Sequence, residues 1–96
     1  MPESAREEVG SRISAVRREI ERLEEELYSL RLERRLLHLE VIAMKFIRHP
    51  VKAFRNGLAM LTQEDARAWR RATLGEREQA IVIAADVMRP RRNNPR

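Results

Sequence analysis

The side chains able to do acid–base or metal chemistry are few and widely spaced. The chain has two histidines, His38 and His49, two aspartates, Asp65 and Asp86, and no cysteine. None of them follows a metal-binding spacing such as H-E-x-x-H or Glu-x-x-His, and the three scattered glycines form no phosphate-binding loop. Without cysteine, disulfides and thiolate chemistry are excluded. We therefore expect no catalytic residue, no metal and no cofactor, and we interpret the protein as non-enzymatic.

Residues 44–55, MKFIRHPVKAFR, are the best candidate for a binding surface in the folded part of the chain. Basic side chains alternate here with large apolar ones, a pattern that suits a phosphate backbone, an acidic protein groove or an anionic membrane surface. The alternative interpretation, which we favour, is that the apolar residues are core and the basic residues are its solvated outer face. The candidate contacts to an anionic partner in this segment are Lys45, Arg48, Lys52 and Arg55.

The C-terminal sequence RPRRNNPR, residues 89–96, is a second candidate. It contributes four of the ten basic residues in the second half of the chain, so its arginines account for most of the net charge of +5. We expect it to be disordered and to bind nucleic acid weakly and without sequence preference, with a salt slope of about −3 to −4. Its candidate contacts are Arg89, Arg91, Arg92 and Arg96.

A heptad pattern occupies the first half of the chain. Apolar residues recur from Val9 with alternating spacings of 4 and 3, which predicts a coiled-coil seam and a homodimer. β-branched residues at early a positions favour a parallel pair, but the flanking charges leave the orientation open. We interpret the acidic run Glu24–Glu26 as a solvated face that pairs with arginines such as Arg18 and Arg22. The predicted seam comprises Val9, Ile13, Val16, Ile20, Leu23, Leu27, Leu30, Leu37, Val41 and Met44.

A second apolar stripe begins after Leu30 on another side of the same helix. It consists of Leu32, Leu36, Leu39, Ala43 and Phe46. Two apolar faces need two covers, so we expect residues 30–48 to meet the chain's own C-terminal segments as well as a partner helix. Arg34, at a seam position, is expected to extend out of the seam.

Proline and capping signals divide the rest of the chain. Pro50 ends the long helix and starts a short amphipathic one that runs from Val51 to Leu61 and tolerates Gly57. The sequences TQED (62–65) and TLGE (73–76) predict capping boxes, and hence helices that start near Gln63 and Leu74. Residues 80–88, apolar nearly all round, predict a buried core helix that ends at Pro90, and Trp69 is expected in the core.

These elements define an all-α fold: a long N-terminal coiled-coil helix, three short helices that pack on its C-terminal half, and a disordered basic tail. The predicted boundaries are a flexible N-terminus at 1–8, the long helix at 9–48, the short-helix region at 50–88 and the tail at 89–96. No signal peptide or membrane span is expected, so we interpret the protein as soluble and intracellular, with membrane binding disfavoured. The predicted function is that of a regulator or adaptor that self-associates and contacts an unidentified protein partner. The alternative from the residues is a dimeric nucleic-acid-binding or packaging protein.

The sequences FRNGLAML (54–61) and IVIAADVMRPR (81–91), with the long charged helix before them, resemble the C-terminal half of paramyxovirus C accessory proteins. The resemblance covers roughly the last 40 residues and carries no functional residue over. It implies a viral accessory factor that modulates viral RNA synthesis and host innate immunity through protein contacts in the host cytoplasm.

Overall fold

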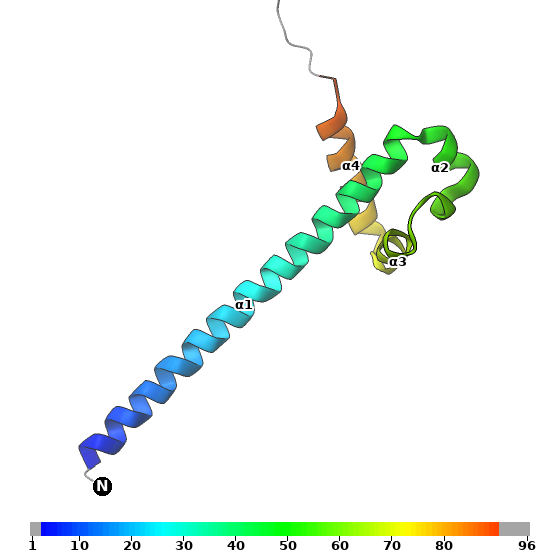
Figure 1. The fold of residues 1–96 in the computed structure, drawn as a ribbon. Helices are drawn as coiled ribbons and strands as arrows, with labels where there is room; N and C mark the ends of the chain where they lie inside the picture. The colour runs from blue at the N-terminus through cyan, green and yellow to red at the C-terminus, as the bar shows by residue number, and fades with distance from the viewer. Residues whose placement is uncertain (1–2, 91–96) are drawn as a thin grey trace, which may run out of the picture. The chain divides into compact units, whose positions relative to one another are not determined.

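The computed structural model describes residues 3–90, and helices account for most of them. In chain order they are α1 (Glu3–Arg48), α2 (Pro50–Asn56), the 3₁₀ turn η1 (Gly57–Met60), α3 (Gln63–Arg71) and α4 (Leu74–Met88), and no strand occurs between residues 3 and 90 (Figure 1). The predicted all-α fold, a long helix followed by shorter ones, is confirmed. The chain divides into two units, Met1–Glu33 and Arg34–Arg96, which are described separately.

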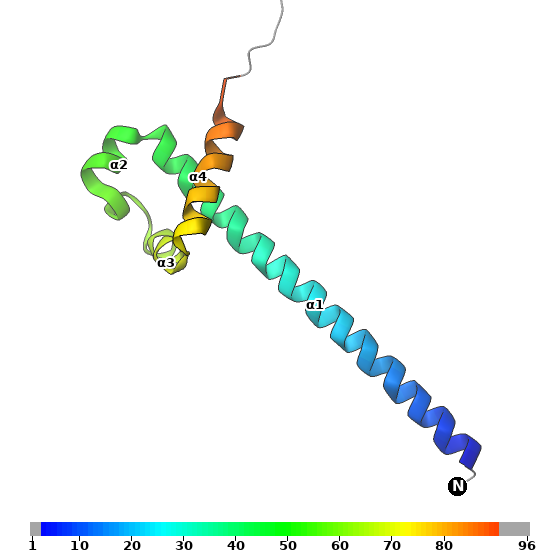
Figure 2. The same cartoon turned by 180° about the vertical axis from the view of Figure 1, so that it is seen from behind.

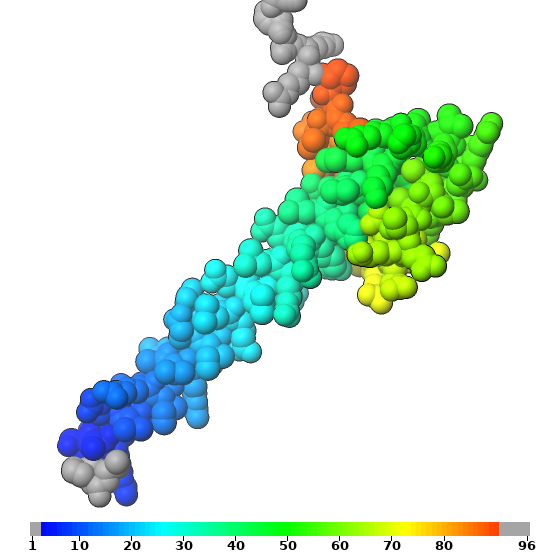
Figure 3. All heavy atoms as spheres, viewed as in Figure 1, coloured from blue at the N-terminus to red at the C-terminus, as the bar shows by residue number. Residues whose placement is uncertain are grey.

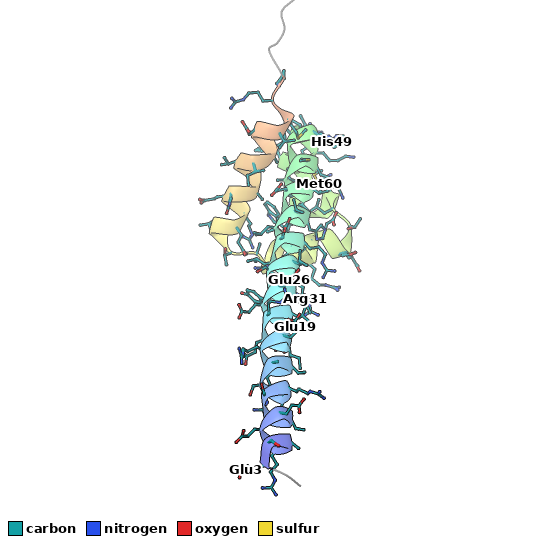
Figure 4. The ribbon with its side chains drawn as sticks, turned by 90° about the vertical axis from the view of Figure 1, so that its left-hand side faces the viewer. Glu3, Glu19, Glu26, Arg31, His49 and Met60 are labelled. Carbon is teal, nitrogen blue, oxygen red and sulfur yellow. The ribbon has the colours of Figure 1, made fainter. Side chains whose placement is uncertain are left out.

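Unit 1 is the N-terminal part of α1. The helix begins at Glu3, six residues before the start predicted at residue 9. Acidic side chains near a helix N-terminus stabilise it, and Glu8 forms an ion pair of 3.2 Å with Arg12 one turn later. No residue between Glu3 and Glu33 is buried, and side chains project from α1 at the level of Glu19, Glu26 and Arg31 (Figure 4).

Unit 2 has a small core where α4 lies beside the C-terminal part of α1 (Figure 2). Ala80 and Ala84, one helical turn apart on α4, are buried, and their small size lets the helix approach α1 closely. Most of the predicted second stripe is in this core, which confirms that the chain's own C-terminal segments cover it. The buried members are Leu39, Ile42, Ala43, Ala72, Ala80 and Ala84, with Leu36, Met44, Phe46, Ile47, Leu61, Ala68 and Trp69 packed against them.

Trp69 is partly buried and packs against the core, in agreement with its predicted place. Its ring meets Phe46 of α1 edge-on, with the ring centroids 5.3 Å apart and the planes at 73°. This is a favoured arrangement for two aromatic rings. α3 is therefore attached to α1 through its only aromatic side chain.

The predicted helix from Val51 to Leu61 is interrupted at Gly57. This glycine has φ +55°, a left-handed conformation that side-chain-bearing residues adopt at a cost, and it ends α2. The 3₁₀ turn that follows brings Leu58 and Leu61 into partial burial, while Val51 and Phe54 on α2 stay exposed. The favoured interpretation that the apolar residues of the 44–55 segment are core is therefore wrong for Val51 and Phe54.

Both threonine caps occur, but only one is a complete capping box. Thr73 accepts from the Glu76 N–H at 3.1 Å, and the Glu76 carboxylate accepts from the Thr73 N–H at 2.9 Å. Thr62 accepts from the Asp65 N–H at 3.1 Å, but the Asp65 carboxylate binds two side chains of α1 instead. The predicted helix starts at Gln63 and Leu74 are confirmed, and the box predicted at residues 62–65 is only half formed.

The last helix, α4, buries only one side of its C-terminal part, although residues 80–88 are apolar nearly all round. Ile81, Val82 and Val87 are 43%, 68% and 63% exposed, so the expected fully buried helix is wrong. α4 contacts the core through a narrow strip that contains Ala80 and Ala84. Most of its other apolar side chains face outward. The helix ends at Met88, two residues before the predicted stop signal, Pro90.

Of the helices that the structure describes, none combines the length and the low charge needed to cross a lipid bilayer.

Candidate functional site

The seam residues of unit 1 form an exposed apolar row. Each of the seven predicted seam positions from Val9 to Leu30 is between 46% and 57% exposed. A helix stripe normally buries such residues against another element. The row therefore has the composition and spacing of a helix–helix contact surface. Its members are Val9, Ile13, Val16, Ile20, Leu23, Leu27 and Leu30.

The three remaining predicted seam residues belong to unit 2 and do not behave alike. Leu37 and Val41 are 50% and 49% exposed. Met44 is half-buried and packs against the core. The chain's own core therefore already covers part of the Met44 side chain, and its place in a seam stays a prediction. Arg34, expected to extend out of the seam, is exposed.

Charged side chains beside the seam pair along the helix. Arg22 donates to Glu19 at 2.6 Å and to Glu26 at 3.3 Å. These pairs confirm the interpretation of the acidic run as a solvated face for its last member, Glu26. Hydrogen bonds to the two carboxylates raise the pKa of Arg22.

The buried acidic residue of unit 2 is Asp65 of α3. Its carboxylate accepts hydrogen bonds from Lys45 Nζ at 2.5 Å and from His38 Nε2 at 2.8 Å. The bond from Lys45 lowers the pKa of Asp65 most, and the bond from His38 lowers it further, against the opposing effect of burial. We call Asp65, His38 and Lys45 the Asp65 cluster.

The cluster attaches α3 to α1, and sequence reasoning missed it. Asp65 is 20 positions from Lys45 and 27 from His38 in the chain, so no local motif connects it to them. One signal was present: His38 and Lys45 are seven residues apart, two helical turns, and so share a face of α1 beside the buried stripe. Within residues 3–90, no group of three or more His, Cys, Asp or Glu side chains is placed to hold a metal ion.

Two more arginines join helices of unit 2, one through an ion pair and one through hydrogen bonds to backbone carbonyl oxygens. Arg35 of α1 donates to the Glu76 carboxylate at 2.8 Å. The hydrogen bond from the Thr73 N–H, with the nearby Arg35 charge, lowers the pKa of Glu76. Arg77 of α4 donates to the carbonyl oxygens of Trp69 and Arg70 at 2.8 and 2.9 Å, which satisfies acceptors at the C-terminal end of α3.

The predicted basic segment is split by the structure. Lys45 belongs to the Asp65 cluster and is not available as a free contact to an anionic partner. Arg48, Lys52 and Arg55, with His49, line an open hollow of about 560 Å³ at the corner between α1 and α2. Phe46 and Ile47 pack against the core, whereas Val51 and Phe54 are 64% and 92% exposed. The favoured interpretation of the segment as core with a solvated rim is therefore right for its first half and wrong for its second.

The predicted tail contacts fall largely outside the described residues, which end at Pro90. Arg91, Arg92 and Arg96 lie beyond that limit. Arg89 is exposed at the end of α4, where it lines a different hollow with Ile81 and Val82. The structure therefore does not bring Arg89 into the hollow at the α1–α2 corner.

No family model, curated protein or solved structure matches the chain, and the predicted resemblance to paramyxovirus C accessory proteins stays a prediction.

Proposed function

We propose that this protein is a non-enzymatic helical adaptor that self-associates through a coiled coil and acts by contacting a protein partner. The observation that carries the proposal is the exposed row from Val9 to Leu30: seven apolar side chains at heptad spacing, each about half exposed. A helix whose apolar stripe has no cover gains little stability from its own sequence, since most helical stability in proteins comes from packing. A second copy of the same row supplies that packing.

The expected gain follows from the exposed fractions. Leu23 and Leu30 are 49% and 56% exposed. Full burial of a leucine is worth roughly 1.5–3 kcal/mol, so covering the exposed half is worth about 1 kcal/mol per leucine. A dimer contains these two leucines twice, so they contribute about 4 kcal/mol, or roughly a thousandfold in dissociation constant.

A different surface is proposed to contact the partner. The outward side of α4 carries Ile81 and Val82 beside a hollow that Arg89 also lines. Apolar side chains with a charged rim are typical of protein–protein contact surfaces. Because these residues are not part of the heptad row, self-association and partner binding are separable by mutation.

The test is a pair of double variants compared by light scattering after size exclusion and by circular dichroism. Leu23→Asp with Leu30→Asp places four carboxylates in the dimer seam and is expected to yield a monomer with reduced helicity. Ser14→Asp with Ser29→Asp adds the same charge to exposed positions off the seam and is the matched control. Equal masses for the two variants would contradict the proposed seam.

A further inference from the structure

The corner between α1 and α2 carries a surface that the core does not use. We call it the corner patch and define it as Arg48, His49, Val51, Lys52, Phe54 and Arg55. All of these residues except Phe54 line an open hollow of about 560 Å³. Phe54 lies on α2 between two of the lining residues in the sequence, and α2 is at the surface of the molecule in the space-filling view of Figure 3. All of them belong to unit 2, and His49 marks the corner itself in Figure 4.

The positive charge of the corner patch is not neutralised locally. From Val41 to Gln63 the chain has four basic residues and no aspartate or glutamate. Lys45 is bound to Asp65, but Arg48, Lys52 and Arg55 form no ion pair with any residue between 3 and 90. Three full positive charges therefore surround one hollow without a counter-charge.

An aromatic ring lies on the same exposed side of α2 as two of these charges. At 100° per residue, Phe54, Val51, Arg55 and Lys52 follow one another around one side of α2, and Ala53, which is half-buried, is on the other. Phe54 is 92% exposed, more than any other large apolar residue described. The fold gains almost nothing from this ring, so its chemistry is free for a ligand.

Sites for single-stranded nucleic acid combine two components, exposed aromatic rings and unpaired basic side chains. The basic groups contact the backbone phosphates, and the ring stacks on a base of any identity. We propose that the corner patch binds single-stranded nucleic acid without sequence preference, through Arg48, Lys52 and Arg55 to phosphates and through Phe54 to a base. This proposal does not depend on self-association.

Other anionic partners fit the patch less well. A protein interface has an apolar core and few lysines, whereas this patch offers only two apolar side chains and includes Lys52. A bilayer surface is flat and would lie across the hollow without filling it. A single nucleic-acid strand can enter the hollow and contact the basic side chains around it. Duplex DNA is recognised by elements that fill a groove, and α2 has only 7 residues.

The expected magnitudes follow from three phosphate contacts and one stacked base. Three contacts to a single strand give a slope of about −2 in log affinity against log salt concentration. Loss of the stacked base is expected to weaken binding by about tenfold or more. Contributions from the C-terminal arginines add to the total but are the same in all variants altered only at the corner.

The test uses the full chain and a labelled single-stranded oligo(U), with fluorescence anisotropy measured across a range of salt concentrations. Replacing Arg48, Lys52 and Arg55 with glutamine is expected to weaken binding and to make the salt slope shallower by about 2. The matched control replaces Arg67, Arg70 and Arg71, three exposed arginines of α3, with glutamine and removes the same charge from the same unit. This control is expected to keep binding within about twofold of the wild type, since these arginines do not line the hollow.

The aromatic contact has its own pair of variants. Phe54→Leu keeps an apolar side chain of similar size but removes the ring, and is expected to weaken binding by about tenfold, whereas Phe54→Tyr keeps the ring and the affinity. The proposal is overturned if oligo(U) does not bind, if the α3 control loses as much affinity as the corner variant, or if Phe54→Leu binds as the wild type does. Binding to phosphatidylserine vesicles that exceeds binding to oligo(U) would overturn it in favour of a membrane surface.

Discussion

Replacing Asp65 with asparagine tests how strongly α3 is attached to α1. The substitution keeps the size of the side chain and the Thr62 cap, which uses the Asp65 backbone N–H. It removes the negative charge that accepts hydrogen bonds from Lys45 at 2.5 Å and His38 at 2.8 Å. Only 12% of the Asp65 side chain is exposed, so water replaces these bonds poorly.

The loss of stability expected for Asp65→Asn depends on how exposed Lys45 and His38 are. Hydrogen bonds to charged groups contribute about 1.5–3 kcal/mol each when buried, but the Lys45 and His38 side chains are 42% and 35% exposed, which lowers the value. We expect Asp65→Asn to lower the free energy of unfolding by about 1–3 kcal/mol in total. For a domain of this size that corresponds to a melting temperature lower by about 4–8 °C for each kcal/mol.

Urea unfolding followed by Trp69 fluorescence measures this loss in the correct unit. Trp69 is the only tryptophan and lies against the core, so its emission reports on unit 2. The control is Asp86→Asn, the same chemical change at an exposed position of α4. If the two variants unfold at the same urea concentration, the Asp65 cluster does not stabilise the fold.

Acid titration checks the same residue by its charge. Because the folded state lowers the pKa of Asp65, its contribution to stability is fully present above the unfolded-state pKa, near 3.8, and is lost as the pH falls through the lower folded-state pKa. The free energy of unfolding of wild type is expected to fall faster than that of Asp65→Asn as the pH drops below about 4. Parallel pH curves for the two proteins would contradict this assignment.

Further predictions concern the caps and glycines. Thr73→Ala is expected to lower the free energy of unfolding by about 1 kcal/mol through loss of the capping box, with Thr73→Ser close to wild type in the same urea assay; equal loss in both would refute the cap. Gly57→Ala is expected to destabilise unit 2 by about 1–2 kcal/mol because φ is +55° there, and an unchanged melting temperature would show that the turn does not need this conformation. Gly10→Ala, with nothing within 4 Å of the added Cβ, is expected to stabilise α1 by about 0.5–1 kcal/mol, seen as higher helicity by circular dichroism; unchanged helicity would count against a continuous helix at this position.

The sequence predicts the helical elements well because their signals are local. Pro50 and the two threonine caps mark where helices start, and the structure has helices at those residues. The spacing of the second stripe also predicts which side of α1 meets the rest of unit 2, since one buried face requires one apolar stripe.

The parts that sequence missed depend on contacts between distant residues. Nothing near Asp65 indicates that its carboxylate leaves the local cap for Lys45, because the two residues meet only in the folded unit. The exposure of Phe54 and Val82 was missed for a similar reason. Apolar composition predicts burial on average, but a core made largely of alanines covers only a narrow strip of each helix.

Sedimentation equilibrium of the wild-type chain over a range of protein concentrations tests the central claim most directly. Self-association through the row from Val9 to Leu30 predicts a mass of twice the 11.3 kDa of one chain, falling toward the monomer mass only on dilution. A mass of 11.3 kDa at every concentration would contradict the proposed coiled coil and leave the exposed row without a function.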